Sequence, residues 1–410
     1  MTNNMLKTFT SWRTYFCESC GMSSRNHVRV WINEFADIFL HRMSTRMFPK
    51  SLDRFVNRIL EWLFIFFGIF KLESVFTKFD IPIRTYCLVE EGRKRGISFR
   101  AFRGPFGFIN YFRMNVNGKE YTFEGLPVAD FANRYDVSEI DDKAKVKKNF
   151  IKGNFPVLQS TSFWFFQKNA ALLYGEKIGF PLVVKPRNGS YSRHTTTHIQ
   201  NKEQLQSAIE MALIYSPTFI VEHFLEDSFV FRATIVDFDY VACVQRTTAN
   251  VVGDGAHTVQ ELIDIKNADP DRGNPDEESY TLFRIVDDAV TDQLLKEQNV
   301  TKHTVPLQGK RIFLQRDPFI RLGADSDEVT DDVHPDNMAL FKDIARYFDI
   351  RVVGLDFLCS DIKKSWKDQP CAVIELNSLP CIEVHHFPSS GKPQNVAGKI
   401  IDLVFKYYVK

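Results

Sequence analysis

Two hydrophobic segments near the C-terminus contain polar side chains whose oxygen atoms suit a cation. The first spans residues 352–358 and contains Asp356, and the second spans residues 372–377 and contains Glu375 and Asn377. Both have the length and composition of β-strands. Because a buried carboxylate without a partner costs several kcal/mol, acids inside such strands indicate a cation that compensates their charge. All three side chains offer hard oxygen ligands, the type that Mg²⁺ takes when it also holds nucleotide phosphates.

The alternative is that these side chains are ordinary polar residues at strand ends that face water. That explanation would account for one such segment on its own. Two segments with the same feature favour the cation site, although the residues by themselves leave both interpretations open.

The composition is that of an ordinary globular protein without a strong overall charge. The chain has 410 residues, of which 44% are hydrophobic and 25% charged, and this length suits two or three domains. A formal charge of +1 argues against nucleic acid as a partner. Seven cysteines, an odd number, and the lack of a cleavable N-terminal leader predict a reducing compartment, the cytoplasm.

Residues 1–79 are expected to form a helical, aromatic leader. Residues 55–79 are rich in aromatic and aliphatic side chains, but the apolar run 62–70 is far shorter than the roughly 20 residues that cross a bilayer. Basic residues flank it, which suits a helix resting on a membrane surface. The alternative is a helix packed on the protein core or at a dimer contact. Cys17 and Cys20 form a C-x-x-C, but no matching ligands for a zinc site accompany it.

A small α/β domain is expected over residues 80–140, followed by a larger α/β (α+β) body over residues 141–410. The small domain has a strand-like run at 85–89 and a hairpin turn at 116–119. In the larger body helical and strand patterns alternate. The expected helices cover 141–150, 162–177 and 202–213, and the expected strands cover 180–185, 218–222, 232–237 and 240–245.

Two further helix starts are marked by local signals. Thr258 and Glu261 have the spacing of a capping box and follow the loop 251–257. Its two glycines allow the backbone to approach a ligand or a neighbouring strand closely. Pro335 begins another helix, and packing into the core fully explains its apolar stripe.

From about residue 141 to its end, the chain resembles the ATP-grasp ligases, and most of all the ATP-grasp domain of cyanophycin synthetases and of bifunctional glutamate–cysteine ligase/glutathione synthetases. The shared phrases cover residues 249–263, 329–335, 354–356, 373–377 and 388–397. The resemblance implies an ATP-grasp fold in which two α+β subdomains hold a nucleotide. Residues 141–230 would then form the nucleotide-lid subdomain, and residues 231–410 would form the metal and substrate subdomain.

The resemblance also implies roles for single residues. Lys143 and Lys185 match the two lysines that place charge against the nucleotide phosphates, and Glu222 matches the hinge acid beside adenine. A solvated helix face is the alternative for Lys143, and an exposed strand end is the alternative for Glu222. Ser190 and Ser192 offer hydroxyl groups to phosphate oxygens.

The remaining matches concern the reacting groups. Arg232 and Arg246 match arginines near the transferring phosphoryl group and the substrate carboxylate. Asp356, Glu375 and Asn377 match the magnesium ligands, in agreement with their interpretation from the strands alone. The implied cofactors are ATP and Mg²⁺, with Mn²⁺ as a substitute.

The resemblance implies amide ligation of a small-molecule or peptide carboxylate with an amine, through an acyl phosphate, by an enzyme that forms a homo-oligomer. The sequence departs from the family pattern in four segments. The loop 187–193 keeps one glycine, residues 229–231 lack an acid, and residues 319–324 and 381–383 also differ. The substrates are therefore not expected to be those of the relatives. A degenerate ATP-grasp scaffold that only binds nucleotide is the alternative, and carboxylate activation without amide formation is a third candidate.

Overall fold

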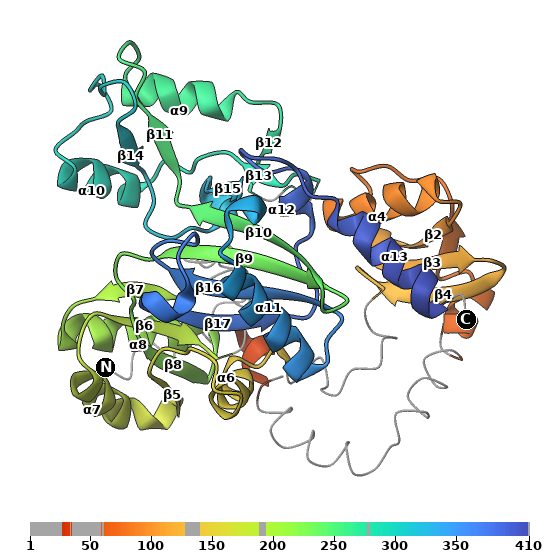
Figure 1. Cartoon of the computed structure of the whole chain (residues 1–410), viewed down its shortest axis with the longest axis horizontal. Helices are drawn as coiled ribbons and strands as arrows, with labels where there is room; N and C mark the ends of the chain where they lie inside the picture. Colours follow the sequence, from red (N-terminus) through yellow and green to blue (C-terminus); the bar gives the residue numbers. More distant parts are fainter. Residues whose placement is uncertain are drawn as a thin grey trace, which may run out of the picture. The chain divides into compact units, whose positions relative to one another are not determined.

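The computed structural model describes residues 27–32, 34, 59, 61–127, 140–187, 194–275, 277 and 279–408 (Figure 1). The chain divides into two compact units. One contains residues 1–59 and 158–224, and the other contains residues 60–157 and 225–410. Each unit has hydrophobic clusters of its own.

The first unit is built on a four-stranded antiparallel sheet in the order β5-β8-β6-β7, which two helices cover on one face. Leu182 and Val184 on β6 and Phe219 and Val221 on β8 pack with residues of the helices in one hydrophobic cluster. Side chains alternate along a strand, so the residues between them point to the other face. The elements are β5 (Ser160–Trp164), η1 (Phe165–Gln167), α7 (Lys168–Ile178), β6 (Leu182–Pro186), β7 (Thr196–Ile199), α8 (Lys202–Tyr215) and β8 (Thr218–His223).

The helix expected over residues 162–177 is wrong in its first part. Residues 162–164 belong to β5, and the helix α7 begins only at Lys168. Phe163 lies opposite Phe219 on β8 and is buried against it, so pairing with a neighbouring strand decides the local structure. The other expected elements of this unit, including β6, α8 and β8, are confirmed.

The second unit is built around a five-stranded antiparallel sheet in the order β15-β10-β9-β16-β17. One face, with Phe231, Ile235, Leu355 and Phe357, packs against helices α6 and α11. The strands expected at the two acidic segments are confirmed as β16 and β17. The elements are α6 (Lys143–Lys152), β9 (Phe229–Val236), β10 (Tyr240–Thr247), β15 (Asp325–Glu328), η3 (Thr330–Asp332), α11 (Pro335–Phe348), β16 (Val352–Cys359), η4 (Trp366–Asp368), β17 (Cys371–Asn377) and α12 (Glu383–His386).

The opposite face of this sheet is covered at one end by the C-terminal helix α13 and the N-terminal layer. Val236, Ala242 and Val352 share a hydrophobic cluster with α13 and with helix α4, which lies alongside α13 (Figure 1). The rest of that face carries the charged residues described below. The elements are β1 (Lys71–Glu73), α4 (Ile83–Lys94), β2 (Ser98–Gly104), β3 (Gly107–Val116), β4 (Lys119–Glu124) and α13 (Val396–Tyr408).

The strand expected at residues 85–89 is wrong, because these residues lie within helix α4. Short apolar runs do not distinguish a strand from a buried helix, and here packing against α13 decides. The turn at 116–119 is confirmed. Asn117 and Gly118 have φ values of 50° and 84°, as a two-residue hairpin turn requires.

A smaller layer of the second unit surrounds the loop 251–257. The predicted capping box is present, since Thr258 and Glu261 bond each other's backbone N–H groups at the start of α9. A side chain on Gly253 would collide with the carbonyl oxygen of Leu307, so this glycine serves backbone packing. The elements are β11 (Asn250–Val252), α9 (Val259–Asn267), β12 (Arg272–Gly273), β13 (Leu282–Phe283), α10 (Ala289–Glu297), β14 (Arg311–Phe313) and η2 (Ile320–Leu322).

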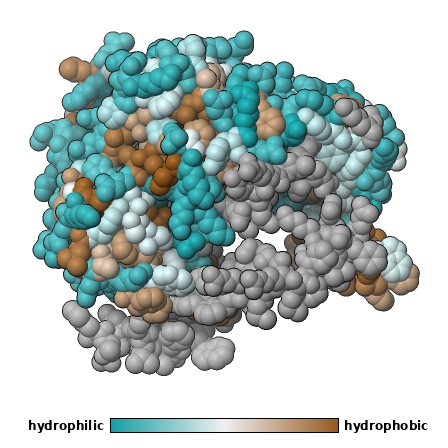
Figure 2. Space-filling view, turned by 60° about the horizontal axis from the view of Figure 1, so that its bottom comes forward, coloured by the Kyte–Doolittle hydropathy of each residue, from teal (hydrophilic) through white to brown (hydrophobic). Residues whose placement is uncertain are grey.

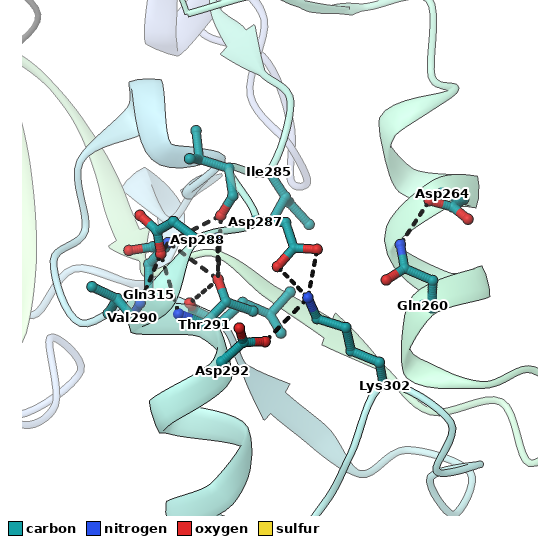
Figure 3. A network of polar contacts seen from close by, with 12 residues as sticks. Gln260, Asp264, Ile285, Asp287, Asp288, Val290, Thr291, Asp292, Lys302 and Gln315 are labelled. Carbon is teal, nitrogen blue, oxygen red and sulfur yellow. Dashed lines mark hydrogen bonds and ion pairs between the residues drawn. The ribbon is translucent and has the colours of Figure 1, made fainter.

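Polar contacts hold the start of α10 in this layer (Figure 3). Asp288 caps the helix by accepting hydrogen bonds from the backbone of Val290 and Thr291, and it also accepts one from Gln315 at 3.0 Å. Lys302 lies between Asp287 and Asp292, with Nζ···O distances of 2.7 and 3.1 Å. The backbone contacts of Asp288 satisfy two of the free N–H groups of the first helical turn.

Most of the leader lies outside the described residues, and Cys17 and Cys20 lie wholly outside them. Residues 61–66 are helical, and Trp62, Phe66 and Phe67 are 60%, 67% and 69% exposed. On the face shown in Figure 2, hydrophobic residues form separate patches. Within the described ranges, no helix is long and apolar enough to cross a membrane.

We expect Gly391→Ala to lower the free energy of unfolding by about 3 kcal/mol, because steric overlap adds to the strain of an L-residue at positive φ. Gly391 has φ +87°, and an added Cβ would collide with the carbonyl oxygen of Glu328. Gly96→Ala is the matched control, since its φ is +81° with open space around it, and it should cost about 1 kcal/mol. Urea unfolding measures both, and equal losses would contradict the steric argument.

Candidate functional site

Four charged side chains form a row across neighbouring strands of the five-stranded sheet. Asp356 on β16 lies opposite Arg232 on β9 and opposite Glu375 on β17. Arg246 on β10 lies two residues beyond Val244, the partner of Arg232. All four therefore point to the same face, away from α6 and α11. The strands place residues that are far apart in the sequence side by side.

Arg232 and Asp356 form a buried, doubly hydrogen-bonded ion pair. Arg232 donates through Nε to Oδ1 and through Nη2 to Oδ2, the second at 2.8 Å, and the residues are 4% and 6% exposed. Burial raises the pKa of Asp356, but the charge and hydrogen bonds of Arg232 and the charge of Arg246 outweigh it and lower the pKa to about 2. Burial also lowers the pKa of Arg232, and Asp356 more than reverses that effect. Both groups are therefore ionised at neutral pH.

Among the described residues, no carboxylate forms an ion pair with Arg246 as Asp356 does with Arg232. Its Nε is buried and has no hydrogen-bond partner among the described residues. Burial lowers the pKa of Arg246, and the charge of Arg232 lowers it further. An arginine in this state can bind an added anion at little reorganisation cost, because its charge is poorly compensated within the protein.

Asn377 adds an amide group to the same face. It lies two residues after Glu375 on β17 and opposite Gly354 on β16. Its Nδ2 is also buried without a partner in the described part of the chain. A Cβ on Gly354 would lie 3.4 Å from the Cβ of Asn377 and 3.5 Å from the Cδ of Arg232. These are ordinary contact distances, and the tightest contact of such a Cβ would be with the Cβ of Pro380, at 3.1 Å.

Lys143, the first residue of α6, reaches this row. Its Nζ lies 3.6 Å from Oε2 of Glu375, and its side chain is 15% exposed, so a fully solvated helix face is excluded. Asp142 caps the helix, while Asp141 accepts hydrogen bonds from the backbone and the hydroxyl of Ser378. The start of α6 is thus tied to the end of β17, which places the lysine beside the carboxylate.

Lys185 and Glu222 meet in the other unit. Lys185 Nζ lies 2.6 Å from Glu222 Oε1, and both residues are buried. Val183 is the strand partner of Glu222, so Lys185, two residues further on, shares its face, which points away from the cluster formed with α7 and α8. An exposed strand end is therefore the wrong interpretation of Glu222. Ser190 and Ser192 lie outside the described residues.

Asp356, Glu375 and Asn377 provide two carboxylates and one amide oxygen on one face, which suits a magnesium ion. Among the described residues, no group of three or more His, Cys, Asp or Glu side chains is arranged to hold a metal. Mg²⁺ in nucleotide enzymes is usually held by one or two carboxylates together with phosphates. The donor set therefore fits a cation whose coordination is completed by phosphate oxygens.

Sequence reasoning missed a buried network beside the row, on the same face of the sheet. His385 is fully buried, with Nδ1 2.9 Å from Glu328 and Nε2 2.8 Å from the hydroxyl of Thr234. Glu328 also accepts hydrogen bonds from Thr330. This network fixes the segment after β17 onto β9 and β15. The only sequence signal near this network was the segment 381–383, which lies just before His385 and departs from the family pattern.

A second missed contact comes from the N-terminal layer. Arg84 on α4 donates to the carbonyl oxygen of Leu379 at 2.7 Å, and its Nη2 lies 3.8 Å from Cys381 Sγ. Its Nε lies 3.7 Å from Glu383 Oε2. No local pattern indicated this role, because Arg84 is almost 300 residues away and its helix resembled a strand.

Comparison with known proteins found several relatives, although no family model matches. Cyanophycin synthetase of Nostoc sp. is 28% identical over 383 residues, which are 92% of this chain and 40% of that protein. The glutathione biosynthesis bifunctional protein GshAB of Pasteurella multocida is 30% identical over 65% of this chain and 35% of its own length. The crystal structure of a bifunctional glutathione synthetase from Pasteurella multocida matches with a TM-score of 0.62 and 25% identity, and covers 80% of this chain and 44% of that one. This chain thus spans less than half the length of these relatives.

We expect Asp356→Asn to lower the free energy of unfolding by about 3 kcal/mol or more, because it leaves the buried charge of Arg232 without a counter-charge. In the folded protein the pKa of Asp356 is about 2, below its ordinary value of 3.8. The pair therefore contributes fully to the free energy of unfolding above pH 3.8, and this contribution is lost as the pH falls to about 2. Asp239→Asn is the control, because Asp239 pairs with Lys342 at the surface, where solvent screens the pair, and its loss should be far smaller. Urea unfolding at pH 7 distinguishes them, and similar losses would refute the argument.

We expect Arg246→Met to leave the free energy of unfolding unchanged or to raise it by about 1 kcal/mol, because it removes a buried cation with an unsatisfied donor. The same urea experiment measures this effect. A loss as large as that of Asp356→Asn would mean that Arg246 has a structural role rather than one in binding.

Proposed function

We propose, from the chain's membership of the ATP-grasp superfamily, that it is an ADP-forming carboxylate–amine ligase that makes an amide bond. Its acid substrate would be an amino acid or a peptide. The observation that carries the proposal is the row on the sheet face, where Arg246 and Asn377 hold unused hydrogen-bond donors beside two carboxylates. Such donors reduce stability unless a ligand satisfies them.

In this proposal, residues 141–230 handle the nucleotide and residues 231–410 hold the metal and the substrates. Lys185 and Lys143 would place positive charge on the phosphates of ATP, and Glu222 would lie beside the adenine. Ser190 and Ser192 would donate to phosphate oxygens. The close contact of Lys185 with Glu222 supports this assignment, because it fixes the lysine's ammonium group on the sheet face.

Asp356, Glu375 and Asn377 would hold Mg²⁺, for which Mn²⁺ would substitute. A bound magnesium ion would neutralise charge on the phosphates during transfer. Arg232 keeps Asp356 ionised and correctly oriented for this task. Lys143 would orient Glu375 in the same way, since its ammonium group lies beside that carboxylate.

The reaction would proceed in two displacements. A carboxylate oxygen of the acid attacks the γ-phosphorus, the bond to the β–γ bridging oxygen breaks, and ADP leaves. The amine nitrogen then attacks the acyl carbon, phosphate leaves with the bonding electrons, and the nitrogen loses a proton. Arg246 would bind the acid's carboxylate and the transferring group, so that the reacting atoms are held together and charge is compensated.

The scaffold alternative is less well supported. A domain that only holds nucleotide does not need a buried arginine with an unsatisfied donor, because such a donor lowers stability and would have no catalytic function there. The loop 187–193, which motivated the alternative, lies outside the described residues apart from Arg187.

We also propose a compartment and an assembly state for the protein. Cys87, Cys243 and Cys359 are buried free thiols, which supports a reducing compartment such as the cytoplasm. We propose that the exposed aromatic residues of the segment 55–79 contact a second copy of the chain in a homo-oligomer. The alternative occupant of this segment is a membrane surface, which vesicle sedimentation would reveal.

We expect an ADP-release screen over pairs of amino acids and dipeptides to find an acid that is required for turnover. Glu375→Gln should reduce ADP release by about 100-fold or more, because it removes a proposed ligand, and chelation of divalent cations should have the same effect. Glu297→Gln, at an exposed ion pair, is the control and should match wild type. If Glu375→Gln released ADP as fast as wild type, the catalytic proposal would fail.

A further inference from the structure

A short helix from the N-terminal leader places a buried carboxylate inside the first unit. Residues 27–32 and Glu34 are helical, and they are called the leader helix below. Glu34 is only 4% exposed. Its Oε2 accepts a hydrogen bond of 2.5 Å from the hydroxyl of Ser216, and its Oε1 accepts one of 2.9 Å from the hydroxyl of Thr218. Ser216 ends α8 and Thr218 begins β8, so the leader helix is bonded to the junction of these two elements.

Aromatic contacts continue along the leader helix. The ring of His27 packs edge-on against His194 and Tyr215, with centroid distances of 5.1 and 5.6 Å. His194 in turn stacks on Tyr215 at 5.3 Å. Trp31 lies 5.7 Å from Phe165. Positions 27, 31 and 34 have the i, i+4, i+7 spacing of one helical face, so the leader helix contacts the unit through one side along its length.

The partners of the leader helix hold both sides of the segment that contains Ser190 and Ser192. The carbonyl oxygen of Thr218 accepts a hydrogen bond of 3.1 Å from the backbone N–H of Arg187. On the other side of the segment, Nδ1 of His194 lies 3.1 Å from the carbonyl oxygen of Met211 on α8. The leader helix therefore contacts the anchoring residue at each side, Thr218 through Glu34 and His194 through His27.

The same contacts act on the strands that carry the proposed nucleotide residues. Thr218 is the first residue of β8, and Glu222 lies further along this strand. Lys185 on β6 lies opposite Ile220 on β8, and Arg187 directly follows β6. A displacement at the start of β8 would therefore change where Lys185 and Glu222 lie. Small displacements of groups that position a substrate cause large losses in an enzyme.

We propose that Glu34 is a positioning residue for the nucleotide and that the leader helix is a fixed part of the nucleotide-binding unit. The inference rests on the nucleotide roles proposed for Lys185 and Glu222. Glu34 holds the start of β8, and β8 holds the chain that leaves β6, before any nucleotide arrives. A site ordered in advance binds more tightly, because less conformational freedom is lost on binding.

The test measures binding of the β,γ-imido analogue of ATP with Mg²⁺ by calorimetry, together with ADP release. Glu34→Gln should weaken binding of the analogue by about tenfold, because its NH₂ group cannot accept a hydrogen bond as the second carboxylate oxygen does. In turnover it should raise KM for ATP by about the same factor and leave kcat and KM for the acid within about twofold. Glu34→Asp keeps both acceptor oxygens and should retain more of the affinity. Glu210→Gln, at an exposed position on α8, should match wild type.

His27→Ala is a second variant that leaves the carboxylate of Glu34 in place. It removes the ring contacts with His194 and Tyr215, and it should weaken binding of the analogue by about threefold. Thermal unfolding checks that each variant is folded. If Glu34→Gln does not fold, the result for His27→Ala decides the test.

The outcomes separate this inference from the ligase proposal. If Glu34→Gln binds the analogue as wild type does, or if kcat and both KM values deteriorate together, the positioning role is overturned while the ligase function stands. If both variants weaken binding of the analogue, but wild type forms no product with any acid, the positioning role stands and the ligase function is removed. A wild type that does not bind the analogue overturns both.

Discussion

The buried ion pair of Arg232 and Asp356 is the interaction on which the site depends. It joins the central strand, β9, to its neighbour β16, and both partners are almost fully buried. Two charges at this depth are tolerated only because each satisfies the other through two hydrogen bonds. Arg232 also affects the ionisation of the groups around it. It stabilises the ionised form of Asp356, and its positive charge disfavours the charged form of Arg246. One pair therefore accounts both for the ionised carboxylate that we propose as a cation ligand and for the poorly compensated arginine that we propose as an anion-binding group.

The charged row of the second unit lies on one face of the five-stranded sheet. On the other face, the residues that pack on α6 and α11 form a hydrophobic cluster around Phe231 and Phe357. The face with the row also packs on α13 and the N-terminal layer at one end. The packing on α6 and α11 and the charged row are thus divided between the two sides of the same strands. Alternation along a β-strand makes this division possible, because neighbouring residues can serve different purposes.

The parts of the structure that depend on local pattern were predictable from the sequence. The length and apolar composition of the segments around Asp356 and Glu375 indicated strands, and β16 and β17 confirm them. The capping box at Thr258 and the helix start at Pro335 were predictable for the same reason. Register was not predictable. The pairing of Arg232 with Asp356 joins residues 124 positions apart, and only the assembled sheet brings them together. Arg84 was missed because an apolar run of five residues does not distinguish a strand from a helix. The roles assigned to Ser190 and Ser192 stay predictions.

The position of the unusual segment 381–383 gives its departure from the family pattern a physical meaning. His385 anchors the segment through Glu328 and Thr234, so its path over the sheet is fixed by buried hydrogen bonds. Within that fixed path, Arg84 on α4 lies 3.8 Å from the Sγ of Cys381 and 3.7 Å from the Oε2 of Glu383. Asp356, Glu375 and Asn377 belong instead to β16 and β17. Because different chain segments supply the two sets of side chains, the segment 381–383 can vary while the residues of the charged row are kept.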